Sequence, residues 1–260
     1  MSPLRTAVRG ARTAIKAVVH HAIAPFVIRA FRARAATCDD AASALALAEG
    51  FEYGRIRITP IQVRSEILAL LETMAASRPR VLLEIGTANG GTLFLFTRVA
   101  APDARLISVD LPGGPFGGGY PAWKASLYRA FARGSQSIEL VRADSHDPAT
   151  ASRVASWLGG KSVDFLFIDG DHSLSGVRAD FELYSPLVAP GGMIAFHDIV
   201  PGPESDVGGV PRFWQELKTR RASVEFVADW KQGGYGIGMI KVANDGGEPA
   251  AAAANAIGTA

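Results

Sequence analysis

Two carboxylates and an imidazole follow one short apolar segment of this sequence. Residues 163–172 read VDFLFIDGDH, so Asp169, Asp171 and His172 come directly after a segment typical of a strand buried on both faces. In open α/β sheets, ligands bind at the carboxyl ends of the strands. These side chains are therefore candidates for acid–base or metal chemistry at the edge of a sheet.

A second polar pair, His197 and Asp198, follows the apolar segment of residues 192–196. Neighbouring strands lie about 4.8 Å apart, so Asp169 and Asp198 can converge on one point. Two adjacent carboxylates repel each other unless a hard divalent cation such as Mg²⁺ binds between them. We expect such a metal site. His197 can be its third ligand only if the strand has already ended there, because adjacent strand residues point to opposite faces.

A plainer interpretation is that Asp169 caps the next helix and Asp198 is solvated in a loop. A bound cation would instead bind a substrate hydroxyl and lower its pKa. His172, whose unperturbed pKa is about 6.5, could then remove the proton as general base. The alternative for His172 is a surface histidine at the start of the following helix.

Strands and helices alternate along most of the chain, which predicts βαβ units and a parallel sheet. We expect an α/β fold with a doubly wound, mostly parallel sheet of seven strands, a C-terminal antiparallel hairpin and helices on both faces. The predicted strands are residues 80–86, 105–110, 137–142, 163–169, 192–197, 224–229 and 236–242. The predicted helices are residues 60–77, 91–100, 120–133, 148–158, 175–187 and 211–221.

The first predicted strand leads into a glycine-bearing turn, since residues 81–92 read VLLEIGTANGGT. Small residues there let the backbone approach a ligand, and the N–H groups of the helix start favour an anionic group. The spacing of Gly86 and Gly90 is neither the dinucleotide fingerprint nor a P-loop. Asp110 and Asp144 end the next two strands, and an acid at the second tip can bind both ribose hydroxyls.

These motifs, with Ser145 after Asp144, resemble the class I S-adenosylmethionine-dependent methyltransferases, which have a Rossmann-like fold. The likeness extends from about residue 80 to residue 242. It implies that Asp110 holds the ribose and that Asp144 and Ser145 contact the adenine. The residues expected against the methionine part and its turn are Glu84, Gly86, Thr87, Asn89 and Gly90.

Residues 167–173, 180–192 and 196–198 resemble a narrower group, the metal-dependent O-methyltransferases of the macrocin and cephalosporin-tailoring type, similar to methyltransferase family 24. The likeness implies methyl transfer from S-adenosylmethionine to a hydroxyl of a sugar or natural-product-like small molecule, with Mg²⁺. Asp169 and Asp198 match metal ligands and His172 matches a base.

The group usually has an acid at the position of His197, so Asp171 is an alternative third ligand. Metal-independent transfer with His172 or His197 as base is the nearest alternative function. A protein that binds the cofactor without catalysis, or acts at a membrane, is another.

The loop of residues 111–123 is rich in glycine, so we expect it to act as a mobile cover over the site. Its Tyr120 and Trp123 are candidates to flank the substrate. The alternative is an ordinary loop whose two aromatic side chains pack inward.

Charge is unevenly distributed along the chain. Residues 1–36 contain seven basic and no acidic side chains, which leaves 20 basic against 25 acidic residues elsewhere. We expect three parts: a basic helical or poorly ordered extension (1–36), the methyltransferase domain (37–242) and a disordered tail (243–260). Weak contact of residues 1–36 with a membrane surface is one interpretation of this charge. The mildly acidic body argues against a nucleic-acid groove.

The single cysteine, Cys38, excludes an internal disulfide framework and a cysteine-based zinc site. No apolar run approaches the ~20 residues that a membrane span needs. We therefore expect a cytoplasmic protein, with a peripheral position at a membrane and a homo-oligomeric state left open.

Overall fold

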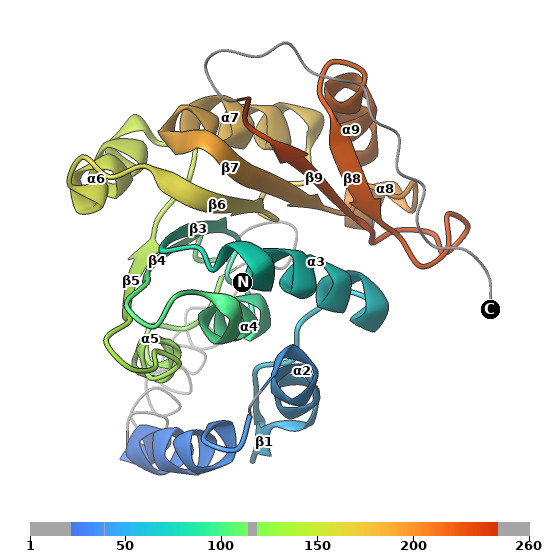
Figure 1. Cartoon of the computed structure of the whole chain (residues 1–260). Helices are drawn as coiled ribbons and strands as arrows, with labels where there is room; N and C mark the ends of the chain where they lie inside the picture. Colours follow the sequence, from blue (N-terminus) through green and yellow to red (C-terminus); the bar gives the residue numbers. More distant parts are fainter. Residues whose placement is uncertain (1–21, 39, 114–118, 244–260) are drawn as a thin grey trace, which may run out of the picture.

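A seven-stranded sheet forms the centre of the computed structural model, which describes residues 22–38, 40–113 and 119–243 (Figure 1). The strand order is β5-β4-β3-β6-β7-β9-β8, with the first five strands parallel and β9 antiparallel to both β7 and β8. The strands are β3 (Val81–Ile85), β4 (Arg105–Asp110), β5 (Ser137–Arg142), β6 (Val163–Ile168), β7 (Val188–His197), β8 (Ser223–Phe226) and β9 (Ile237–Lys241). The predicted mostly parallel sheet with its antiparallel hairpin is confirmed.

The central strands are apolar on both faces because helices cover both sides of the sheet. In β6, Phe165 and Phe167 belong to one buried cluster, whereas Leu166 and Ile168 belong to the other. The first cluster is covered by α2 (Ala41–Gly50), α3 (Arg64–Ser77), α4 (Gly91–Val99) and α5 (Lys124–Arg129). The second is covered by α6 (Pro148–Leu158), α7 (Leu174–Tyr184) and α9 (Val210–Lys218).

Several short elements lie outside the prediction. They are α2, a small hairpin of β1 (Glu52–Tyr53) and β2 (Ile56–Arg57), and the helix α8 (Glu204–Val207). The predicted helix of residues 175–187 comprises α7 and the 3-10 helix η1 (Ser185–Leu187). Helix α2 begins at a capping box, in which the Asp40 side chain accepts from the Ser43 N–H at 2.7 Å and the Ser43 hydroxyl accepts from the Asp40 N–H at 3.2 Å.

Residues 22–35 form a helix that runs through Pro25 and packs on the body of the protein. Phe31 is 1% exposed, and its ring lies 4.9 to 5.4 Å from the rings of Phe51, Phe94 and Phe131. We expected residues 1–36 to form a basic helical or poorly ordered extension; residues 22–35 are helical and join the core through apolar side chains on one helix face. Residues 1–21 and 244–260 lie outside the described residues, so the first part of the extension and the disordered tail stay predictions.

No helix among the described residues is long and apolar enough to span a membrane. Membrane contact through the basic segment and the oligomeric state stay predictions.

Candidate active site

The glycine turn between β3 and α4 depends on two glycines. Gly86 has a φ of +96°, and a Cβ there would lie 1.9 Å from the carbonyl oxygen of Asp169. Gly90 has a φ of +80°, and a Cβ there would lie 2.7 Å from the ring of Tyr128. Both positions combine a left-handed backbone with a close neighbour, so no side chain fits without a shift. Gly86 thereby brings the glycine turn directly against the tip of β6.

Asp110, at the end of β4, is buried at 5% exposure and turns one oxygen toward the glycine turn. Its Oδ2 accepts a hydrogen bond from the Ala88 N–H at 2.8 Å, and burial raises the pKa of its carboxyl above the usual range. Asp110 and Gly86 line a cavity of about 460 Å³, a size in the ordinary range for small-molecule sites.

Glu84 and Thr87 lie beneath the turn and do not line this cavity. The carboxylate of Glu84 is 2% exposed and accepts hydrogen bonds from the hydroxyls of Thr92 at 2.6 Å and Ser108 at 2.5 Å. Burial raises the pKa of Glu84 to about 8 despite these two hydrogen bonds. Asn89 is exposed and Gly90 packs on Tyr128, so neither lines the cavity. These four residues support the turn from below or outside it.

The turn after β5 forms another wall of the cavity through Asp144, Ser145 and His146. Asp144 accepts from the His146 N–H at 2.9 Å, and the Tyr184 hydroxyl of α7 donates to the Ser145 carbonyl at 2.7 Å. The His146 imidazole lies 3.3 Å from the Oδ1 atom of Asp180, a carboxylate of α7 with no exposed surface. Helix α7 therefore fixes the turn that was predicted to contact adenine.

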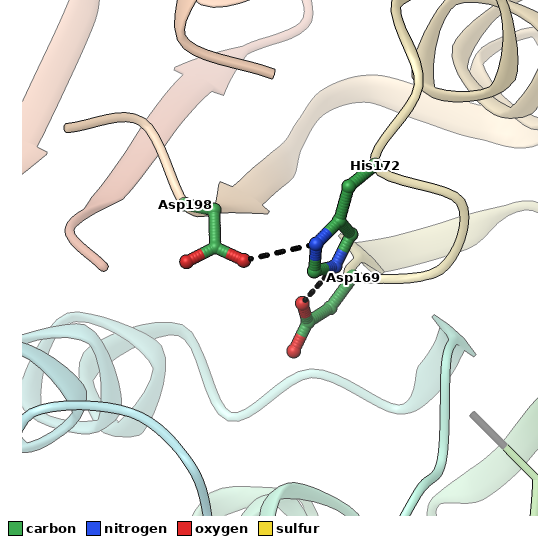
Figure 2. Close-up of side chains that lie close together, drawn as sticks. All are labelled: Asp169, His172 and Asp198. Carbon is green, nitrogen blue, oxygen red and sulfur yellow. Dashed lines mark ion pairs between the residues drawn. The ribbon is translucent and has the colours of Figure 1, made fainter. Parts of the chain in front are cut away.

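Asp169, His172 and Asp198, which line the same cavity, point toward one another (Figure 2). The Nε2 atom of His172 is 3.5 Å from Asp169 Oδ1, and its Nδ1 atom is 3.4 Å from Asp198 Oδ2. One ligand atom from each of the three residues lies within 4.8 Å of the others. The predicted convergence of two strand tips and His172 is thus present in the geometry.

The side chains of His197 and Asp198 both lie near Asp169 because β7 ends at His197 and Asp198 takes a left-handed φ of +61°. Because the chain turns at this point, the side chains of His197 and Asp198 do not point to opposite faces of the sheet. The condition stated above for both to act at one site is therefore met. The Nδ1 atom of His197 lies 3.2 Å from Asp169 Oδ1 and 3.4 Å from Asp198 Oδ2. Its Nε2 atom is buried and has no hydrogen-bond partner among the described residues.

The charges of the acids and imidazoles compensate each other. Burial alone would lower the pKa of His172, but the hydrogen bond and charge of Asp169 raise it to about 9. Burial would likewise lower the pKa of His197, yet the charges of Asp169 and Asp198 raise it to about 10. Burial would raise the pKa of Asp169, and the two imidazoles lower it to about 2. Two carboxylates therefore face two groups able to carry positive charge.

The tautomer of His172 follows from its neighbour in α8. Its Nδ1 atom contacts the carbonyl oxygen of Asp206, which can only accept a hydrogen bond. Nδ1 then carries a proton, and Nε2 is the atom that can take up or release one. This atom faces the side of Asp169.

Asp171, the alternative third ligand, is turned away from this group. Its Oδ1 accepts from the Ser173 N–H at 2.8 Å, and a Cβ at Gly176 would lie 2.3 Å from its carboxyl carbon. Its carboxylate therefore lies against the start of α7. Among the described residues, the set that can hold a cation at one point contains His172 rather than Asp171 or His197.

Tyr120 and Trp123 are not on the cavity wall and instead lie in the core, which corrects the expectation that they flank the substrate. They are 3% and 8% exposed, and the Tyr120 ring packs 4.8 Å from that of Tyr128. The segment turns inward because its aromatic side chains join the apolar cluster beneath α5. The loop's residues 114–118 lie outside the described residues, so its action as a cover stays a prediction.

Three residues of the site had no place in the prediction. Gln62 donates from Nε2 to Asp169 Oδ2 at 2.8 Å, and the Tyr235 N–H donates to Asp198 Oδ1 at 3.2 Å. Glu66 is 1% exposed and accepts from the Gly236 N–H at 2.9 Å. A buried carboxylate in a first helical turn has no sequence signature, since its partners come from another part of the chain.

The parallel sheet, the glycine turn and the acids at successive strand tips are the features on which the resemblance to S-adenosylmethionine-dependent methyltransferases was based. Residues 83–199 match the Methyltransf_24 family model, described as a methyltransferase domain. The family resemblance predicted from the sequence is confirmed.

Curated relatives share part of the chain. Over 146 residues it is 27% identical to the rhamnosyl O-methyltransferase of Mycobacterium tuberculosis (strain H37Rv), covering 54% of this chain and 51% of that protein. Over 168 residues it is 30% identical to an uncharacterized protein of Sinorhizobium fredii, covering 64% of this chain and 17% of the relative. The chain thus spans about half or less of the length of these relatives.

Solved structures show the same fold. The O-methyltransferase TomG from Streptomyces achromogenes, in complex with S-adenosylmethionine, has a TM-score of 0.51 at 19% identity, over 80% of this chain and 92% of TomG. An O-methyltransferase from Bacillus cereus, in complex with S-adenosylhomocysteine, has a TM-score of 0.51 at 18% identity, over 83% and 90% of the two chains.

Proposed function

We propose that this protein transfers a methyl group from S-adenosylmethionine to a hydroxyl of a small molecule, assisted by a divalent cation such as Mg²⁺. One observation carries the proposal. The glycine turn and the group of Asp169, His172 and Asp198 line the same cavity. A methyl donor bound at the glycine turn would therefore lie beside these acid–base residues.

The residues around the glycine turn have the chemistry that S-adenosylmethionine requires. This molecule would supply the methyl group from its sulfonium sulfur. Gly86 lines the cavity within the glycine turn, and Asp110 offers a carboxylate for hydroxyl groups at the tip of β4. Asp144 and Ser145 offer polar atoms at the next tip. The methyl transfer would be a direct in-line displacement at the methyl carbon. Holding both reactants in one orientation supplies much of the acceleration of such a reaction.

The group of Asp169, His172 and Asp198 fits a hard divalent cation. Asp169 and Asp198 offer oxygen ligands, and a divalent cation would balance their charges in place of the protons on His172 and His197. His172 would then be neutral and able to act as a base. A cation held there would lower the pKa of the acceptor hydroxyl. His197 holds the two carboxylates together through its Nδ1 atom.

His172 is proposed as the base that removes the hydroxyl proton. The contact of Nδ1 with the Asp206 carbonyl leaves Nε2 to accept it, and Nε2 faces Asp169. His172 is also able to serve as a ligand, since it belongs to the group of three. The two roles predict different losses when the imidazole is removed.

The acceptor class is proposed by analogy with the relatives. The mycobacterial relatives are named rhamnosyl O-methyltransferases, so deoxyhexose glycosides are the first acceptors to test. Ile61, at 57% exposure, and Tyr235, at 40%, line the cavity and offer apolar surface for a sugar ring.

A transfer assay with labelled S-adenosylmethionine and a panel of sugar, phenol and polyketide acceptors tests the proposal. We expect activity that EDTA abolishes and added Mg²⁺ restores. Full activity in the chelator would refute the cation's role and favour metal-independent transfer by a histidine base. Absence of transfer to any hydroxyl, together with tight S-adenosylmethionine binding, would favour a binding protein.

His172→Ala separates the two roles of the imidazole. As a base, its loss lowers turnover by about 10²- to 10⁴-fold and leaves Mn²⁺ affinity near that of the wild type. As a ligand, its loss weakens Mn²⁺ binding itself. Full turnover in this variant would remove His172 from the mechanism.

A further inference from the structure

Each of the two acids at the strand tips has one oxygen engaged by a donor from outside the group. Asp169 Oδ2 accepts from Gln62 Nε2 at 2.8 Å, and Asp198 Oδ1 accepts from the Tyr235 N–H at 3.2 Å. The other oxygens, Asp169 Oδ1 and Asp198 Oδ2, both face the imidazoles of His172 and His197. Each carboxylate therefore presents a single oxygen to the shared point.

Gln62 is fixed by this one contact. Its side chain is buried at 9% exposure, and its Oε1 atom accepts no hydrogen bond from the described residues. The hydrogen bond to Asp169 alone therefore sets the direction of the amide, although leaving Oε1 without a donor is costly. A role confined to packing would be served equally well by an apolar side chain.

Asp198 is held less directly, through the segment between β8 and β9. Glu66, in the first turn of α3, accepts from the N–H groups of Gly236 at 2.9 Å and Ala228 at 3.0 Å, and from Gln232 Nε2 at 2.8 Å. Tyr235, with a φ of +61°, comes directly before Gly236 and donates to Asp198. The buried Glu66 thus anchors the segment that orients Asp198 to the start of α3. Gln62 lies just before the same helix.

We infer that Gln62 and Glu66 are positioning residues that restrict Asp169 and Asp198 to one ligand oxygen each, and so favour a small octahedral cation over Ca²⁺. Mg²⁺ requires near-ideal octahedral geometry, whereas Ca²⁺ accepts six to eight oxygens and bidentate carboxylates. The inference rests on the cation site of the proposed function. Both residues lie outside residues 83–199, the segment that the family model matches.

The first test is Gln62→Met, which keeps the length of the side chain and removes the donor. Mn²⁺ affinity, measured by electron paramagnetic resonance on the full-length protein, is expected to fall about 10- to 100-fold, the usual effect of losing a residue that orients a metal ligand. Ca²⁺ affinity is expected to fall less, because the freed Oδ2 of Asp169 becomes available for bidentate binding. The Kd for S-adenosylmethionine by calorimetry is expected to stay close to the wild-type value, since Gln62 is not among the residues that line the cavity.

The second test is Glu66→Gln, with Glu72→Gln as the matched control on the exposed side of the same helix. We expect Mn²⁺ affinity to fall in the first variant and to stay unchanged in the second. A lowered melting temperature with unchanged Mn²⁺ affinity would assign Glu66 a purely structural role and overturn its part of the inference.

The outcomes separate this inference from the proposed function. Wild-type protein that binds Mn²⁺, together with a Gln62→Met variant of the same affinity and the same preference over Ca²⁺, overturns the inference alone. Wild-type protein that binds no Mn²⁺ overturns the cation's part in the proposed function and this inference with it.

Discussion

The His146–Asp180 pair gives a prediction that depends on charge rather than on shape. Asp180 has no exposed surface, and neither of its oxygens accepts a hydrogen bond from the described residues. The imidazole of His146, at 3.3 Å, is the cationic group paired with it in that part of the chain. Replacing His146 by Leu would leave a buried carboxylate without a counter-charge.

Removal of one partner from a buried ion pair costs about 3–5 kcal/mol. Because the imidazole is 29% exposed, we expect His146→Leu to lower the free energy of unfolding by about 3 kcal/mol near pH 6.5, the low end of that range. The double variant His146→Leu/Asp180→Leu should recover most of this loss, since an apolar pair of similar volume often replaces a buried ion pair without cost.

The loss should depend on pH. The carboxylate of Asp180 raises the pKa of His146 from 6.5 to about 9 in the folded protein. A group whose pKa is raised by folding stabilises the protein fully below its unfolded pKa, and this stabilisation disappears as pH rises through the folded pKa. The difference between wild type and His146→Leu should therefore be largest below about pH 6.5 and shrink toward about pH 10.

Urea unfolding of the wild type and both variants, followed by circular dichroism at several pH values, measures these differences. An equal difference at every pH would show that His146 acts through packing. A double variant as unstable as the single one would show that Asp180 carries no unpaired charge to relieve.

Two further predictions concern the core. Phe31→Ala should lower the free energy of unfolding by about 3–5 kcal/mol. The control Phe26→Ala, at a residue that is 63% exposed, should change it by less than about 0.5 kcal/mol. Equal effects of the two variants in urea unfolding would contradict a packed helix at residues 22–35. Tyr120→Phe removes a buried hydroxyl that lacks a hydrogen-bond partner among the described residues, so the free energy of unfolding should rise by up to about 1 kcal/mol. The KM for the acceptor should stay unchanged. A raised KM would show that Tyr120 contacts the substrate.

The central strands were predictable because both of their faces are buried. Residues 105–110 form β4 with the predicted bounds, since a buried, mainly apolar run bounded by polar residues has few other solutions. The edge strand β5, residues 137–142, also has the predicted bounds. Helix α2 was missed because its alanines and leucines show no single apolar stripe. Its capping box at Asp40 and Ser43 was the available signal.

The candidate site was predictable where it depended on strand ends. Asp169 and Asp198 follow adjacent parallel strands, so their convergence follows from topology. The contacts of Gln62 with Asp169 and of Glu66 with Gly236 join residues 107 and 170 positions apart. Such contacts depend on where α3 lies on the sheet, and no local pattern encodes that position.

His197 alters the charge of the site relative to the resembling family, which usually has an acid at this position. A third carboxylate would add negative charge beside Asp169 and Asp198, whereas the imidazole of His197 can carry a positive charge, as its raised pKa of about 10 indicates. A divalent cation would therefore compete with protons on His172 and His197 for the same two carboxylates. With fewer anionic ligands to attract the cation, the orientation of the two remaining acids becomes more important. That is the role the geometry gives to Gln62 and to the segment held by Glu66.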